Sequence, residues 1–202
     1  MDIAALLWKH PRPMRFARLA TLMLFVSIVI SIRSATGTAA PAGGVEKAAD
    51  GQLNLPPAMG WQDWQVARDQ HAPRATVKVF VRRSETPATA KVRVVVAQTP
   101  KPTFDSPQAV VDALVQSAAH QCKKADAKTL DKSAMDMTFE MRAFGCPGQK
   151  GERYLLQRIA FIGDWELQVT YAPMIPTDDL PPSEKAQALK LLSSATITNA
   201  AH

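Results

Sequence analysis

The sequence has 202 residues, of which 47% are hydrophobic and 21% charged, and a formal net charge of +6. This composition is that of an ordinary globular protein, and it excludes collagen-like, disordered and membrane-bundle proteins. Residues 1–40 carry five basic and one acidic side chain, against 19 basic and 17 acidic in the rest. Because no run of basic residues after residue 40 is longer than two, we expect no nucleic-acid partner.

Residues 1–40 have the layout of an export signal. The uncharged apolar run at 20–32 is preceded by three arginines and followed by small residues. The three are Arg12, Arg15 and Arg18. We therefore predict a signal peptide and a periplasmic protein.

The apolar run has thirteen residues, short of the roughly twenty that a membrane-spanning helix needs. We expect cleavage after Ala39 or Ala42, and Met14 would be a more usual start than Met1. The alternative is an uncleaved anchor in the inner membrane with the same domain in the periplasm, which would be the protein's only membrane contact.

Residues 41–60 are rich in Ala, Gly and Pro, which predicts a flexible spacer. We expect one folded domain at 61–198 and a tail at 199–202. The first two strands are predicted at 76–81 and 91–97, where valines alternate with polar residues. If they form a hairpin, we expect the odd-numbered valines of the first strand beside the even-numbered valines of the second.

Helical spacing of apolar residues predicts a helix from Ser106, its N-cap, to Cys122. Three strands follow, at 134–144, 152–162 and 165–172, joined by short turns that require antiparallel pairing. A last helix is predicted to begin with Ser183 as its cap. The fold class is therefore α+β, with a single antiparallel sheet, the order β-β-α-β-β-β-α, and the helices packed on one face.

Cys122 ends the predicted helix, and Cys146 follows the predicted strand at 134–144. In an exported protein we expect these two thiols to form a disulfide. The alternative is a reactive or metal-binding thiol. No neighbouring His or second Cys pair has the spacing that such a site needs.

The common catalytic and cofactor motifs do not occur in the sequence. Glycines form neither a dinucleotide loop nor a P-loop, and neither zinc-protease nor serine-hydrolase signatures are present. We therefore predict no catalytic residues, no metal and no cofactor.

Trp61 and Trp64 stand at the start of the predicted domain, where an exposed aromatic pair could grip a partner. The alternative is that the two indoles close the core.

Four basic residues, Lys78, Arg82, Lys91 and Arg93, are predicted to share the polar face of the first two strands. Like charges that face each other across a ladder are unfavourable unless solvent or an anionic partner screens them. A solvated face and a partner surface are the two interpretations.

The segments 146–148, 151–152 and 162–164, with Tyr171 and the helix after Pro182, resemble a family of small exported Gram-negative bacterial proteins of uncharacterised role. The strand order also resembles the PsbP/Mog1-like α+β arrangement, whose members serve as assembly or accessory factors. These resemblances imply a fold and an accessory role, and they carry over no active site.

We accordingly expect a non-enzymatic protein that binds a protein partner in the cell envelope, as an accessory factor of envelope assembly or secretion. One alternative is an inhibitor or immunity protein against a secreted enzyme. The other is a hydrolase whose site forms only in three dimensions.

Overall fold

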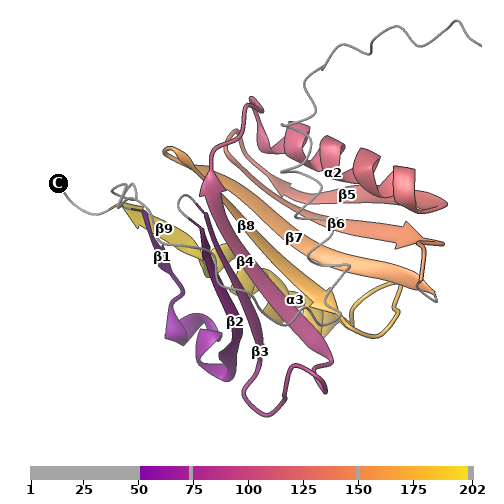
Figure 1. Ribbon diagram of the computed structural model, residues 1–202, viewed down its shortest axis with the longest axis horizontal. Helices are drawn as coiled ribbons and strands as arrows, with labels where there is room; N and C mark the ends of the chain where they lie inside the picture. The colour runs from indigo at the N-terminus through magenta and orange to yellow at the C-terminus, as the bar shows by residue number, and fades with distance from the viewer. Residues whose placement is uncertain (1–50, 73–74, 149–150, 200–202) are drawn as a thin grey trace, which may run out of the picture. The chain divides into compact units, whose positions relative to one another are not determined.

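The computed structural model describes residues 51–72, 75–148 and 151–199 (Figure 1). They form a seven-stranded antiparallel sheet, a two-stranded sheet and two α-helices. The predicted signal peptide at 1–40, the first half of the predicted spacer and residues 200–202 lie outside the described residues.

The seven-stranded sheet has the order β2-β3-β4-β8-β7-β6-β5. Its strands are β2 (Trp64–Ala72), β3 (Ala75–Arg82), β4 (Val92–Pro100), β5 (Lys124–Lys132), β6 (Asp136–Phe144), β7 (Glu152–Ile162) and β8 (Trp165–Pro173). The helices are α2 (Pro107–Gln121) and α3 (Pro182–Ser194). The strand β1 (Gly51–Asn54) pairs with β9 (Thr196–Asn199), and two short 3-10 turns, η1 (Pro57–Met59) and η2 (Trp61–Asp63), follow β1.

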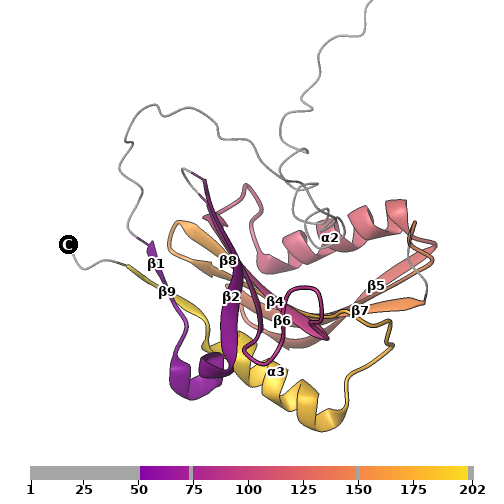
Figure 2. The same ribbon diagram turned by 60° about the horizontal axis from the view of Figure 1, so that its bottom comes forward.

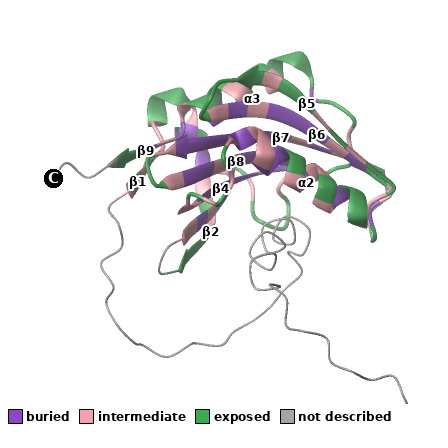
Figure 3. Ribbon diagram, turned by 90° about the horizontal axis from the view of Figure 1, so that it is seen from above, coloured by how far each residue is buried: buried purple, intermediate pink, exposed green. Residues whose placement is uncertain are grey.

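The two helices lie on opposite faces of the large sheet, so the prediction that both pack on one face is wrong (Figure 2). The α3 face carries Leu156, Val169 and Tyr171, which join the core cluster that α3 completes. Helix α2 lies over β5 and β6 on the other face. Central strands such as β4, where three successive valines at 94–96 are buried, have two apolar faces, and each face needs a cover (Figure 3).

The register of β3 and β4 also differs from the prediction. Val79 pairs with Val95 and Phe80 with Val94, so odd-numbered residues face odd-numbered ones. The expected register assumed that each strand has one solvent-exposed face. Because both faces of β4 are buried, the alternation of valine with polar residues did not determine the register.

Two strands of the large sheet were missed, and both are its outer strands. β2 and β5 are largely exposed and polar, so they lack the apolar alternation that predicts a strand. Each contains an irregularity, between Val66 and Arg68 in β2 and between Thr129 and Asp131 in β5, where one extra residue interrupts the pairing.

The two-stranded sheet was missed as well. β1 lies within the predicted spacer, and β9 reaches the first residue of the predicted tail. Each strand has four residues, and the two strands come from opposite ends of the domain's sequence. A pairing so short and so distant along the chain leaves no local signal.

The predicted helix start at Ser106 is confirmed, because its hydroxyl accepts a hydrogen bond from the backbone N–H of Ala109 at 3.3 Å. The predicted cap at Ser183 is wrong, since α3 begins at Pro182 and Pro181 occupies the cap position. Proline at the first helical position has a suitable backbone angle and no N–H to satisfy.

The predicted disulfide between Cys122 and Cys146 is present. It joins the end of α2 to the loop after β6, and the backbone N–H of Lys123 donates to the carbonyl of Phe144 beside it at 2.9 Å. The two half-cystines therefore close the base of the β5–β6 hairpin. Within the described part of the chain, no helix is both long and apolar enough to cross a membrane.

Candidate functional site

Trp61 and Trp64 are buried, each 6% exposed, and so do not form an exposed aromatic pair. The Trp61 indole N–H donates to the Ser194 hydroxyl at 2.9 Å, which ties η2 to the end of α3. The ring of Trp61 packs edge-on against Phe80 at 5.2 Å. The alternative interpretation, that the two indoles close the core, describes their positions.

The four predicted basic residues do not share one face. Lys78 forms an ion pair with Asp69 on the neighbouring strand β2. Arg93 donates to the carbonyl of Pro87 at 2.8 Å and lies between Val92 and Val94, whose side chains point to the α3 face, so its own points to the other. Arg82 and Lys91, by contrast, line the same surface depression, described next.

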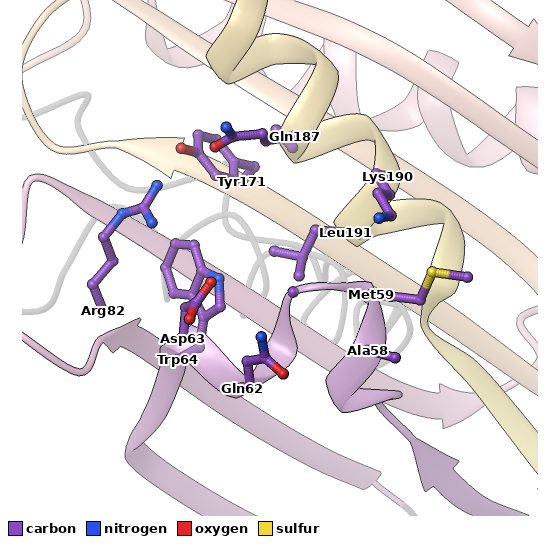
Figure 4. A pocket seen from close by; sticks show the side chains of 12 residues that line it. Ala58, Met59, Gln62, Asp63, Trp64, Arg82, Tyr171, Gln187, Lys190 and Leu191 are labelled. Atoms are coloured by element: carbon purple, nitrogen blue, oxygen red, sulfur yellow. The ribbon is translucent and has the colours of Figure 1, made fainter.

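Two adjoining cavities run along α3, with volumes of about 330 Å³ and 440 Å³. Arg82 and Gln187 line both of them. We call the two together the α3 groove. The first cavity lies between η1, η2 and the second half of α3, and Figure 4 shows it with Arg82 on one side and Leu191 and Lys190 of the helix on the other. The second lies between the start of β4, the segment after β8 and the first half of α3.

An aromatic pair forms the inner wall of the first cavity. The rings of Trp64 and Tyr171 meet edge-on at 6.2 Å, and the Arg82 guanidinium lies over the Trp64 ring at 5.1 Å. The Tyr171 hydroxyl donates to Glu184 Oε1 at 2.6 Å, and burial raises the pKa of Tyr171 above its ordinary value. Tyr171 is therefore a neutral hydrogen-bond donor at physiological pH, held in place by α3.

Large apolar side chains gather at the rim of the groove. Among the described residues six large hydrophobic side chains are exposed, and two of them line the groove. Met59, 43% exposed, lines the first cavity, and Ile175, 64% exposed, lines the second, with Met174 next to it in the chain. Exposed apolar groups that collect around a depression are typical of a binding surface.

The acidic groups of the groove are mostly satisfied from within the protein. Glu184 accepts from Tyr171, and Glu85 accepts from the backbone N–H of Lys91 at 3.3 Å. Asp179 pairs with Lys185 at 3.4 Å, and the backbone N–H of Leu180 is the first of the groups that hold the pKa of Asp179 below its usual range.

A buried ion-pair network fixes the start of α3 beside the second cavity. Lys185 contacts the carboxylate of Glu140, which is 1% exposed, and Arg142 lies 3.7 Å from the same carboxylate. The contact with Glu140 is the main reason that the pKa of Lys185 is raised. One wall of the groove is thus anchored to the middle of β6.

The described residues bring no three His, Cys, Asp or Glu side chains together as potential metal ligands. His71 is on the outer strand β2, where it contacts Asp69 at 2.9 Å, and His120 is near the end of α2.

Sequence reasoning missed most of the groove, because its walls come from segments distant along the chain. One local signal was available. Met174 and Ile175 lie between Pro173 and Pro176, and two large apolar residues in a loop bounded by prolines indicate an exposed apolar patch rather than core.

No family model matches the sequence, and neither does any curated protein. Among solved structures, the chain is similar to the solution structure of the cyanobacterial PsbP, CyanoP, from Synechocystis sp. PCC 6803. The two share 16% sequence identity, with 79% of this chain and 98% of that chain covered and a TM-score of 0.48. No residue role is carried over from that protein. The resemblance to exported Gram-negative proteins stays a prediction.

Proposed function

We propose that this protein is a non-enzymatic periplasmic accessory factor of envelope assembly or secretion, and that it binds a protein partner through the α3 groove. The observation that carries the proposal is that Met59 and Ile175, two of the most exposed large apolar side chains among the described residues, line two adjoining cavities. Exposed apolar side chains cost solvation free energy, and a partner that covers them recovers it.

The composition of the groove supports a binding role. Arginine is one of the residue types in which binding energy at protein interfaces is concentrated, and the half-buried Arg82 lines both cavities, supported from below by the buried ring of Trp64. The wall is also rigid before a partner arrives, because Tyr171 is bonded to α3 and α3 is anchored by Lys185 to the buried Glu140. A surface that is already ordered loses little conformational entropy on binding.

The test is site-specific photo-crosslinking in the full-length protein expressed in a Gram-negative bacterium. A photoreactive amino acid replaces Ile175 in the groove or, as the matched control, Asp112, which is exposed on α2 on the opposite face of the sheet. We expect a discrete adduct from position 175 and none from position 112, and we expect mass spectrometry to identify an envelope-assembly or secretion component in it.

The other outcomes separate the alternatives. A secreted enzyme in the adduct, inhibited by this protein in purified form, would replace the accessory role with that of an inhibitor or immunity protein. Equal adducts from positions 175 and 112 would remove the groove from the proposal. Turnover of a cell-wall, lipid or peptide substrate by the purified protein, with no adduct at position 175, would overturn the binding role in favour of a hydrolase.

A further inference from the structure

We propose that Arg158 is a positioning residue of the α3 groove: it holds the C-terminal end of α3, and so fixes the first cavity in the shape that the partner binds, without touching the partner itself. This inference rests on the proposed function and names what sets the geometry of its site. Arg158 belongs to β7, on the face of the sheet that α3 covers, and it lines neither cavity.

The guanidinium of Arg158 joins two segments of the protein. Its Nε and Nη2 donate to the carboxylate of Asp136 at 2.9 Å and 2.6 Å. Its Nη1 donates to the carbonyl oxygens of Leu192, Ser193 and Ala195 at 3.0, 3.2 and 2.7 Å. The side chain is only 12% exposed, so water competes little for these bonds. Because the donors of a guanidinium point in fixed directions, one side chain can serve a carboxylate and a second set of acceptors at once.

The end of α3 lacks the glycine that closes many helices. The last carbonyl groups of a helix have no partner within the helix, and a left-handed glycine after the last turn often satisfies them. In α3 that position is held by Ala195 in an extended conformation, with φ −68° and ψ 133°. Arg158 supplies the missing donors, and its positive charge lies at the negative end of the helix dipole. The position of the last turn therefore depends on this side chain.

The last turn of α3 carries one wall of the first cavity and the connection to the other. Lys190 and Leu191 line the cavity from the helix, and η1 and η2 line it from the opposite side (Figure 4). The Ser194 hydroxyl accepts from the indole N–H of Trp61 in η2 at 2.9 Å and donates to the carbonyl of Leu191 at 2.8 Å. This Ser194–Trp61 hydrogen bond is the joint between the two walls.

Release of the helix end should change both walls together. Without its donors the last turn can fray, since helix ends open at a small cost in free energy. Leu191 and the Ser194–Trp61 joint would move with it, and the cavity would lose the preorganised shape that keeps the entropy cost of binding small. The start of α3 is held separately, by Lys185 on Glu140, so the second cavity should respond less.

The test compares two variants of the full-length protein, each of which loosens one end of α3. Arg158→Lys keeps the charge but cannot bond to Asp136 and to the helix end in the same geometry. Lys185→Met, the matched control, loosens the other end and lies in neither cavity. Hydrogen exchange by NMR follows the Trp61 indole N–H, which reports on the joint, and the slowest backbone amides of the central strand β8, which report on global stability.

We expect Arg158→Lys to accelerate exchange of the Trp61 indole at least about tenfold relative to the β8 amides, and Lys185→Met to leave this ratio unchanged. A residue with a merely structural role would accelerate both signals by the same factor. An equal ratio in the two variants would therefore overturn the inference.

The effect on the partner is measured by photo-crosslinking from Met59, in the first cavity. Arg158→Lys should reduce the yield of the partner adduct at least about fivefold, because the cavity is no longer preorganised. Arg68→Lys, the same substitution on the exposed outer strand β2, should leave the yield unchanged.

An unchanged adduct from Met59 in Arg158→Lys, with accelerated exchange of the Trp61 indole, would overturn the positioning role and leave the proposed function standing. The absence of any adduct from the wild type would overturn the proposed function. The exchange measurement needs no partner, so the two failures can be told apart.

Discussion

Replacing both half-cystines, Cys122→Ala with Cys146→Ala, opens a covalent loop that contains the whole β5–β6 hairpin. The two cysteines are 24 residues apart. In the chain-entropy model, releasing a loop of this length costs about 3.5 kcal/mol of stability at 25 °C, because the unfolded chain regains freedom that the crosslink removed. For a domain of this size, each kcal/mol moves the melting temperature by about 2–4 °C. We therefore expect the variant to melt about 7–14 °C lower.

The loss should be concentrated at one side of the sheet. β5 is an outer strand that pairs only with β6, and few of its side chains are buried. Without the disulfide, its attachment depends on that one ladder and on the contact with α2. Hydrogen exchange should accelerate most in β5, and least in β8, which lies between β4 and β7.

The assay is urea unfolding at neutral pH with and without a reductant. The wild type should lose the same stability on reduction that the double variant loses by mutation, and the variant should not respond to the reductant. The reasoning is refuted if the variant loses less than about 1 kcal/mol, or if exchange accelerates equally in β8, since a local crosslink would not explain a uniform loss.

Three further predictions concern buried polar groups and a helix cap. Lys185→Met leaves Glu140 buried with its main partner gone and should cost about 3 kcal/mol in urea unfolding, whereas adding Glu140→Gln should restore part of the loss; an unaltered single variant would show that the pair has no role in stability. Burial raises the pKa of Glu166, so the folded state binds that proton more tightly than the unfolded state, and stability falls as pH rises above about 4.3. Glu166→Gln should therefore stabilise the protein at pH 7.5 and leave it unchanged at pH 3.5, and a gain of equal size at both pH values would contradict this. Ser106→Ala removes the cap of α2 and should cost about 1 kcal/mol by thermal unfolding, an expectation that a wild-type melting temperature would refute.

The elements that could be predicted from the sequence are those whose own residues indicate, by their pattern or their local chemistry, which structure forms. β7 occupies the predicted range, 152–162, because it is a long run of mostly apolar residues ended by a Gly-Asp turn. The start of α2 followed from Ser106 and Pro107, which favour a helix N-terminus by local chemistry alone. The disulfide followed from the two thiols and the predicted compartment.

What could not be predicted depends on contacts between distant segments. The even side of β3 carries Lys78, Phe80 and Arg82, which looked like a wet face, yet it faces the core cluster that α3 completes. The position of α3 on that side depends on the path of the chain after Pro173, and no periodicity reports that path. The contact of Arg82 with the Trp64 ring could not be predicted either. Arg82 was predicted as one of four surface cations, and of those four it alone contacts that ring.

The two outer strands of the large sheet have a consequence for association between chains. β2 and β5 each carry an extra residue that breaks the spacing of their outward-facing N–H and C=O groups, and lysines recur along β5. A neighbouring chain in extended form finds no regular ladder to join at either margin of this sheet. The margins of this sheet are therefore poor templates for the strand-on-strand growth that leads to fibrils.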